Sequence, residues 1–421
     1  MASSPVSLYV HMPWCSSKCD YCDFYSRPCS AVPDSYIQAV INQASYFART
    51  AQISSWKTVY IGGGTPSLMT PGQMETLCKG IMNSTGSPFI PEEFTMEMNP
   101  QSLSPEKLHA AANGGVDRLS LGIQSLTEEA LRAVNRHCTA RTARNAMDTV
   151  KSHWKGRLSL DAIAGLPEQD DGRFESSLKS IIEYSPDHIS LYTLTVEEGT
   201  PLDRNIQSGK LSLPEDLGDN QWILGRQILE SGGYAQYEVS NFARPGEKSL
   251  HNSAYWAQQD YAGCGSGATS SFYSRDDQGK IHGALRITGT TDTEEYTRFW
   301  LDGDNLNPSR LPEPKSIPGE KEELDAQTCE FEFLMTGLRT LDGISAGEYR
   351  KRYGHLKWNG SLENRLGKAD GIWHEYESLG RTRERIIEPA LPLPQGTPAD
   401  RRFSLNSQGI LFLNDFLVNL L

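Results

Sequence analysis

Short apolar runs alternate with amphipathic segments along the first half of the chain. Six runs have the length and the β-branched and aromatic content of strands: 7–12, 57–63, 93–98, 118–123, 158–165 and 188–196. The segments between them space their apolar residues as helices do: 34–51, 71–82, 104–112, 127–134, 140–151 and 173–184. A strand–helix unit repeated six times predicts a parallel sheet with crossovers of one hand. We therefore expect an α/β fold built on a partial, TIM-like (β/α)6 barrel.

The pattern weakens after about residue 200 and divides the chain into four segments. Residues 1–235 make up the predicted barrel, and 236–301 are predicted to be extended and loop structure that closes one end of it. Residues 302–325 are rich in Pro, Asn, Asp, Glu and Lys, a composition that predicts a linker. Helical spacing of apolar residues returns in 326–421, so we expect a smaller, mainly helical C-terminal domain there.

The composition of the 421-residue chain is that of a globular protein and narrows its partners. Its residues are 38% hydrophobic and 22% charged, and no stretch has the roughly 18 to 20 uncharged apolar residues of a membrane-spanning helix. The amino terminus lacks the basic and apolar regions of a secretory leader, so we expect a cytoplasmic protein. The formal net charge of -13 argues against nonspecific binding of nucleic acid, which depends on clustered Lys and Arg.

Three cysteines follow the first predicted strand. Cys15, Cys19 and Cys22 have the spacing C-x3-C-x2-C. Three thiolates can hold a cuboidal iron–sulfur cluster and leave one iron without a protein ligand, because such clusters normally have four cysteine ligands. The alternative is a structural zinc site, for which His11 or Cys29 would supply the fourth ligand. Structural zinc sites usually have a second closely spaced ligand pair, so the spacing favours a cluster.

Polar and glycine-rich positions occur where the next predicted strands end. The segment Gly62-Gly63-Gly64-Thr65-Pro66 ends the second strand, Glu97 and Asn99 end the third, and Gln124 ends the fourth; Asp161 lies within the fifth. In parallel α/β folds the functional residues gather at the carboxyl ends of the strands. These positions therefore predict a single polar site at that face of the barrel.

The cysteine spacing, the GGGTP segment and the Glu, Gln and Arg positions resemble the radical S-adenosylmethionine (SAM) superfamily. Within it, they are similar to the branch of oxygen-independent coproporphyrinogen oxidases and HemW-type haem chaperones, over nearly the whole chain. The resemblance implies a radical SAM barrel with a [4Fe-4S] cluster on Cys15, Cys19 and Cys22, whose open iron binds the amino and carboxylate groups of SAM. An electron from the cluster would then cleave SAM to methionine and a 5'-deoxyadenosyl radical.

The same resemblance assigns further residues to SAM. Tyr9 and Tyr21 would lie against the cofactor, and Gly63, Gly64 and Thr65 would receive its amino group and methionyl part, since glycine allows close approach of backbone. The ribose, amino and carboxylate groups would be held by Glu97, Gln124, Arg136 and Asp161. The glycine-rich stretch 263–270 would be either a tight turn or a segment that closes over the adenosine.

Two positions distinguish the members of this branch. Coproporphyrinogen oxidases of the family have a further cysteine two residues after the third ligand, where this chain has Phe24. Residues 251–256, His-Asn-Ser-Ala-Tyr-Trp, match the HNxxYW motif of the HemW-type proteins. The match implies haem contact by His251, Asn252, Tyr255 and Trp256, since histidine is an axial ligand of haem iron and aromatic rings suit a flat macrocycle. Outside such a family, a lone His beside Tyr and Trp is more often a hydrogen-bonded core residue. Direct ligation of iron by His251 stays open.

These features favour a SAM-binding, [4Fe-4S] haem chaperone that binds haem as cargo and passes it to apo-haemoproteins, such as respiratory proteins at the membrane. Peripheral association with the membrane would fit that role. The alternative is an oxygen-independent coproporphyrinogen III oxidase, which abstracts hydrogen from propionate side chains before decarboxylation. Radical modification of tRNA fits the cluster but conflicts with the acidic charge. Whether the protein is an enzyme stays open, because productive cleavage of SAM would need an electron donor such as a flavodoxin or ferredoxin. The oligomeric state is undetermined.

Overall fold

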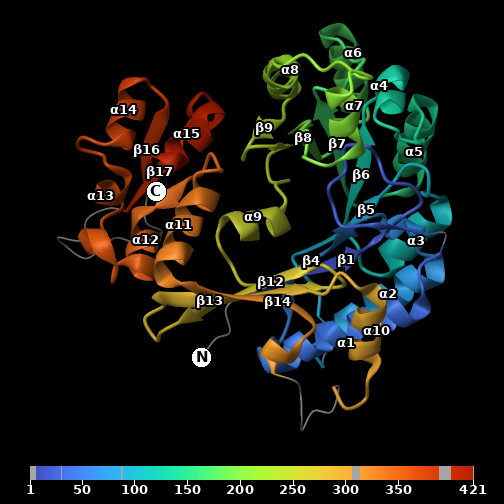
Figure 1. Cartoon of the computed structure of the whole chain (residues 1–421), viewed down its shortest axis with the longest axis horizontal. Coiled ribbons are helices and arrows are strands. Elements are labelled where there is room, and N and C mark those ends of the chain that lie inside the picture. Colours follow the sequence, from blue (N-terminus) through green and yellow to red (C-terminus); the bar gives the residue numbers. More distant parts are fainter. Residues whose placement is uncertain (1–5, 30, 87–88, 306–312, 388–399, 421) are drawn as a thin grey trace.

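Six parallel strands form the centre of the protein (Figure 1). The computed structural model describes residues 6–29, 31–86, 89–305, 313–387 and 400–420. The central strands follow one another in the sheet in chain order: β1 (Val6–Met12), β4 (Trp56–Gly63), β5 (Glu93–Met98), β6 (Arg118–Gln124), β7 (Arg157–Ala164) and β8 (His188–Thr193). Each pairs in parallel with the next. The (β/α)6 core predicted from the apolar pattern is therefore confirmed.

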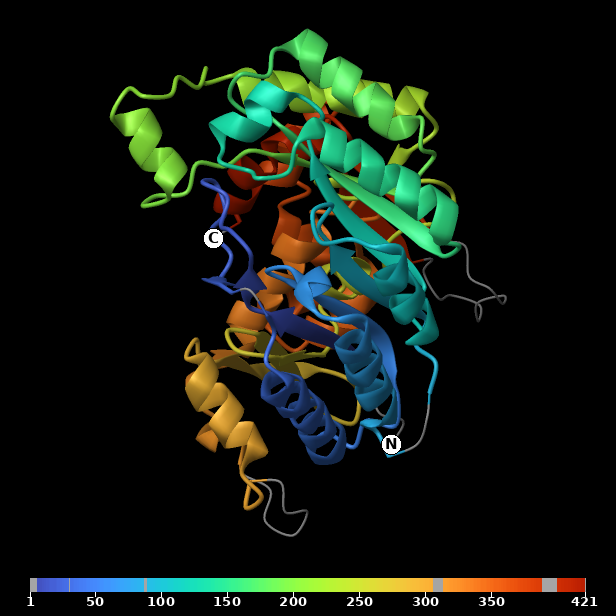
Figure 2. The ribbon, with the colours of Figure 1, turned by 90° about the vertical axis from the view of Figure 1, so that its right-hand side faces the viewer.

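Helices connect the strands and cover the outer face of the curved sheet (Figure 2). They are α1 (Asp34–Thr50), α2 (Pro71–Asn83), α3 (Pro105–Asn113), α4 (Glu128–Ala133), α5 (Ala140–His153), α6 (Asp171–Ile182), α7 (Pro201–Gln207) and α8 (Leu217–Ser231). Helix α5 shows why these segments are helical: it buries Ala143, Ala146, Met147 and Val150, which form one stripe of an α-helix. The Thr139 hydroxyl accepts a hydrogen bond from the backbone N–H of Thr142 and so caps the helix.

Further strands extend the sheet on both sides. Strand β11 (Tyr261–Cys264) pairs in parallel with β1 and is followed by antiparallel strands β12 (Thr269–Arg275), β13 (Ile281–Gly289) and β14 (Gly319–Asp325). On the other side, β10 (Asn241–Ala243) pairs antiparallel with β8, and β9 (Ala235–Gln236) pairs antiparallel with β10. Within the described residues the sheet has twelve strands, and its edge strands β14 and β9 do not pair with each other. The barrel is therefore partial, as predicted.

Two local expectations are wrong. The predicted linker 302–325 ends in strand β14, which pairs with β13 from Gly283–Asp325 to Gly289–Gly319. The charged side chains of this strand hide its periodicity; such side chains are common on edge strands, where backbone hydrogen bonds alone can hold the pairing. Residues 236–301 also contain two helices in addition to strands, namely α9 (Leu250–Trp256) and α10 (Thr293–Leu301).

The C-terminal domain is mainly helical and has its own core. It contains α11 (Ala326–Gly337), α12 (Ala346–Tyr353), α13 (Leu362–Leu366), α14 (Ile372–Ser378) and α15 (Leu413–Val418). A small antiparallel sheet of β15 (Ile344–Ser345), β17 (Arg401–Leu405) and β16 (Thr382–Ile386), which the apolar pattern did not predict, lies among them. Buried Trp373, Phe403 and Phe416 join this core to Ile281 and Leu324 of the sheet extension. The domain is thereby packed against β13 and β14 (Figure 1).

None of the helices in the described part of the chain is long and apolar enough to cross a membrane.

The start of α2 allows a direct test of local stability. Thr70 accepts a hydrogen bond from the N–H of Gln73, whose side chain accepts one from the N–H of Thr70, so the two residues form a capping box. Thr70→Ala should lower the free energy of unfolding by about 1 kcal/mol. The same change at exposed Thr76, inside the helix, should lower it far less. Chemical denaturation of both variants measures the difference, and equal losses would contradict the capping role.

Candidate functional site

The loop after β1 presents three thiols to a cleft at the carboxyl ends of the barrel strands. Within this loop, β2 (Trp14–Cys15) pairs in parallel with β3 (Arg27–Pro28), and the N–H of Cys29 donates to the carbonyl of Cys15. The cleft has a volume of about 560 Å³. The residues predicted for a cluster and SAM that line it are Cys15, Cys19, Tyr21, Cys22, Gly63, Gly64, Thr65, Glu97, Gln124, Arg136 and Asp161.

Each of two cysteines has a hydrogen-bond donor from the barrel. The Thr65 hydroxyl lies 3.5 Å from Cys15 Sγ, and Arg136 Nη1 lies 3.7 Å from Cys19 Sγ. Hydrogen bonds and positive charge near sulfur stabilise a thiolate ligand. Burial raises the pKa of Cys22 above its ordinary value, because desolvation disfavours the thiolate.

The zinc alternative finds no support among the described residues, where no three His, Cys, Asp or Glu side chains meet as ligands of a single metal ion. Both candidates for a fourth ligand have other partners. His11 bonds through Nδ1 to the Tyr9 hydroxyl at 2.9 Å and through Nε2 to the Tyr25 carbonyl at 3.0 Å. Cys29 Sγ lies 2.8 Å from the carbonyl of Ala31. A cuboidal cluster takes its thiolates on separate irons, so its cysteines do not have to meet at one point.

The glycine segment after β4 lies directly against the cysteine loop. Gly63 has φ of +104°, and a Cβ there would lie 2.4 Å from His11 Nδ1. At Gly64 a Cβ would lie 2.6 Å from the carbonyl oxygen of Trp14. Backbone N–H groups of Gly64 and Thr65 donate to the carbonyls of Met12 and Trp14, at 2.8 and 2.7 Å. Only glycine permits this close approach, which places backbone at the edge of the cleft.

Two partly buried carboxyl groups give the cleft the potential for negative charge. Glu97 accepts hydrogen bonds from the Tyr60 hydroxyl at 2.6 Å and from the N–H of Gly63 at 3.1 Å. Asp161 accepts from the Ser120 hydroxyl at 3.1 Å. Burial raises the pKa of Glu97 to about 7 and that of Asp161 to about 6, because desolvation disfavours the charged form. A cationic ligand would reverse these shifts.

Gln124 and Arg136 have polar atoms without partners in the protein. Gln124 adopts φ of +69° at an irregularity in the pairing of β6 with β7, and its Oε1 is buried and unbonded. Arg136 Nη2 donates to the carbonyl of Gly122, whereas its Nε is buried without an acceptor. Buried polar atoms normally have hydrogen-bond partners. With the carboxylates, they form a set of acceptors and donors that fits a ligand such as SAM, which has an ammonium, a sulfonium, hydroxyls and a carboxylate.

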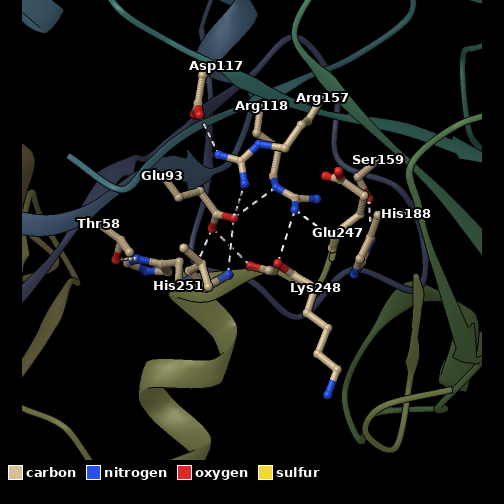
Figure 3. Close-up of polar contacts among 12 residues, drawn as sticks. Thr58, Glu93, Asp117, Arg118, Arg157, Ser159, His188, Glu247, Lys248 and His251 are labelled. Carbon is tan, nitrogen blue, oxygen red and sulfur yellow. Dashed lines mark hydrogen bonds and ion pairs between the residues drawn. The ribbon is translucent and has the colours of Figure 1, made fainter. Parts of the chain in front are cut away.

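The remaining predicted residues lie outside the cleft. Tyr9 bonds to His11 below it. The segment 251–256, with His251, Asn252, Tyr255 and Trp256, forms helix α9 and lies at the opposite, amino end of the barrel strands, near Thr58 and Glu93 (Figure 3). His251 is 1% exposed, and its ring nitrogens lie 2.8 Å from the Thr58 hydroxyl and 2.9 Å from the Tyr255 hydroxyl. Haem contact by this helix stays a prediction, and in this fold His251 has no free ring nitrogen.

The glycine-rich stretch 263–270 forms the turn between β11 and β12. Gly265 has φ of +112°, and a Cβ there would lie 2.4 Å from the carbonyl oxygen of His11. None of these residues lines the cleft. The tight-turn interpretation therefore fits the structure.

Sequence reasoning missed three side chains that matter to the cleft. Tyr60 lies two residues before Gly62 and on the same face of β4, and the alternation of side chains along the strand could have identified it. Tyr192, at the end of β8, is 43% exposed and lines the cleft. Phe24, noted above only as a replacement for cysteine, is 71% exposed and also lines it. An exposed phenylalanine beside a polar cleft has no signal in sequence periodicity.

Comparison with known proteins agrees with this geometry. Residues 9–181 match the radical SAM superfamily. Heme chaperone HemW of Escherichia coli K12 is 34% identical over 351 residues, which cover 82% of this chain and 85% of that protein. Heme chaperone HemW of Bacillus subtilis is 30% identical, with 83% and 87% covered. Radical S-adenosyl methionine domain-containing protein 1, mitochondrial, of Bos taurus is 36% identical, with 64% and 61% covered.

Among solved structures, coproporphyrinogen III oxidase (HemN) from Escherichia coli, a radical SAM enzyme, matches with a TM-score of 0.74. The match covers 99% of this chain and 90% of that chain at 18% identity, and so it shows a shared fold. The relatives that are similar in sequence over most of their length identify the family more narrowly than this shared fold does. The chain belongs to the HemW family of the radical SAM superfamily.

Proposed function

We propose that the protein is a haem chaperone, which binds haem and delivers it to apo-haemoproteins. Its relatives of this family are named for that activity and align over more than four fifths of the chain. The observation that favours it over the oxidase is Phe24, which lies at the cleft in the position where coproporphyrinogen oxidases have a further cysteine. An exposed aromatic side chain there offers a contact for a flat macrocycle.

The superfamily implies a [4Fe-4S] cluster and SAM, and the residues of the cleft fit both groups. Cys15, Cys19 and Cys22 would hold the cluster, which when bound supplies an open iron for SAM and a single electron. Arg136 would offset the charge of the thiolate of Cys19, which it already approaches. The polar groups of the cleft would orient SAM.

Each cleft residue would take the part of SAM that matches its charge. Glu97 and Asp161 would face cationic or hydroxyl groups as carboxylates, and the guanidinium of Arg136 would pair with the SAM carboxylate. Tyr60 would hold Glu97 in place through its short hydrogen bond. Gln124 Oε1, which is buried without a partner, would accept from the ligand.

Haem binding and transfer test the proposal directly. Anaerobically reconstituted protein should bind haem with a Soret absorption band and pass it to a purified apo-haemoprotein. Incubation with SAM and coproporphyrinogen III under reducing conditions should give no carbon dioxide. Protein with a full cluster that neither binds nor transfers haem would contradict the chaperone function. Formation of protoporphyrinogen would favour the oxidase instead.

The cluster ligands can be tested one at a time. Replacing any of Cys15, Cys19 and Cys22 by Ala should remove the cluster, because two thiolates leave two irons without a protein ligand. Cys29→Ala provides a control in the same loop and should keep iron and sulfide at the wild-type level, since Cys29 does not line the cleft. Iron and sulfide analysis of the ligand variants and of the control measures the cluster content. Loss of the cluster in the control would contradict the assignment.

The raised pKa values predict how affinity for SAM depends on pH. Near pH 5 the cleft carboxyl groups are protonated, and a cationic ligand must displace those protons. Affinity should therefore rise as the pH increases from 5 to about 7.5, by up to about tenfold per unit for each proton released. Without SAM, the stability of the protein has the opposite pH dependence. The folded protein holds these two protons more tightly than the unfolded chain, so its free energy of unfolding falls as the pH rises through about 6 to 7.

Glu97→Gln is the matched variant for this pH dependence. It cannot ionise, so it should bind SAM more weakly than wild type at pH 7.5 and show a flatter dependence on pH. Equilibrium dialysis with labelled SAM at several pH values measures the affinity. A wild-type affinity that does not change between pH 5 and 7.5 would contradict the role of these carboxylates.

A further inference from the structure

Helix α9 closes the amino end of the barrel, opposite the cleft, and begins at a buried carboxylate. Glu93 accepts hydrogen bonds from the Ser249 hydroxyl at 3.2 Å and from the N–H groups of Leu250 and His251 at 3.1 and 3.0 Å (Figure 3). Arg118 Nε lies 3.0 Å from the same carboxylate, and both side chains are buried. The start of α9 is therefore held at one position inside the barrel.

The ring of His251 is fixed on three sides. The Thr58 hydroxyl donates to Ser7 at 2.9 Å, so it accepts from His251 Nδ1–H at 2.8 Å. The other ring nitrogen, Nε2, then accepts from the Tyr255 hydroxyl at 2.9 Å. This network assigns one neutral tautomer. The third contact is a stacked arrangement with the ring of Tyr60, whose centroid is 5.0 Å away at an interplanar angle of 27°.

Tyr60 connects this ring to the cleft. Its ring rests on His251 and its hydroxyl donates to Glu97 Oε1 at 2.6 Å. Glu97 lines the cleft. Only one side chain therefore separates His251 from a carboxyl group that would face the cofactor.

The other end of α9 is bonded to the C-terminal domain. Gln258 donates to the carbonyl of Cys329 at 2.6 Å and accepts from the Tyr353 hydroxyl at 2.6 Å. Arg352 donates to the carbonyl of Ala257 at 3.0 Å. The helix thus lies between the inside of the barrel and the core of the C-terminal domain (Figure 1).

We propose that His251 is a positioning residue of the SAM site: helix α9 presents its ring to Tyr60, and this contact holds the Tyr60 hydroxyl against Glu97. The proposal rests on the proposed binding of SAM in the cleft and is independent of haem. It gives the 251–256 segment a role inside the barrel instead of at a haem surface. The orientation of Glu97 then depends on how α9 is seated between the two domains.

Three variants test the chain of contacts in the full-length, reconstituted protein. Tyr60→Phe keeps the stacked ring and removes the hydrogen bond to Glu97; the affinity for SAM should fall about tenfold, as expected for a lost hydrogen bond to a charged group. His251→Leu and Thr58→Val should weaken SAM binding in the same direction. All three should keep the cluster iron. They should also move the midpoint of the pH dependence of SAM affinity upward, because Glu97 loses a donor that favours its charged form.

Tyr349→Phe is the matched control for a purely structural effect. Its hydroxyl donates to Glu330 at 2.8 Å in the buried core of the C-terminal domain, so the change removes a similar buried bond far from the cleft. Its Tm should fall as in Tyr60→Phe, whereas SAM affinity and the pH midpoint should stay at wild-type values. These two readouts separate positioning from stability.

Distinct outcomes would overturn the two proposals. If Tyr60→Phe weakens SAM binding and Thr58→Val and any folded His251→Leu protein do not, His251 does not act through Tyr60. If these two variants lose haem and retain wild-type SAM affinity, the residue serves haem binding and the positioning role is wrong. Wild-type protein that binds SAM but no haem would overturn the chaperone function alone.

Discussion

The seating of helix α9 depends on the buried carboxylate of Glu93. This carboxylate, at the start of β5, receives the hydroxyl and N–H donors at the start of α9 together with the guanidinium of Arg118, the first residue of β6 (Figure 3). Arg118 also donates to the carbonyls of Glu247 and Lys248, just before the helix. Removing one member of a buried ion pair typically costs about 3–5 kcal/mol, since it leaves an uncompensated charge. Loss of either Glu93 or Arg118 should therefore strongly destabilise this amino end of the barrel, which we call the floor.

The carboxyl groups at the two ends of the barrel differ in whether the protein itself supplies a cation to pair with them. At the floor, the carboxylate of Glu93 is compensated within the protein, and burial lowers the pKa of both His251 and His188 to about 3, so that they are neutral. In the cleft, Glu97 and Asp161 form no ion pair within the described residues, and desolvation raises their pKa values. At the amino end Glu93 is paired with Arg118, whereas the two cleft carboxyl groups have no such partner among the described residues. This difference distinguishes a packing network from a binding site in the same barrel.

The position of α9 also gives the C-terminal domain a route to the cleft. The domain contacts the end of the helix through Gln258, and the start of the helix lies below Tyr60 and Glu97. Helix α9 therefore connects the core of the C-terminal domain to the side chains that pack beneath the cleft.

Local patterns in the sequence predicted most of the barrel, the cysteine ligands and the polar residues at the strand ends. Alternation with periods of 2 and 3.6 residues located the six parallel strands and their helices, and parallel pairing then brings strand ends such as Glu97 and Gln124 to one face. The spacing of Cys15, Cys19 and Cys22 is local in the same sense. The resemblance to a family identified most of the polar residues that line this cleft, but it also assigned Tyr9, which lies outside it.

Only the tertiary structure decided the place of the 251–256 segment. Besides Tyr255 in its own helix, His251 bonds to Thr58 and Glu93, 193 and 158 residues away, and no local period encodes contacts over such distances. Strand β14 escaped prediction for a related reason, because an edge strand is held by backbone pairing that its charged side chains do not reveal. Sequence periodicity indicates which face of a helix or strand is buried, but it does not indicate which other element packs against that face. For this protein, that second fact separates a histidine at a ligand surface from a histidine inside the barrel.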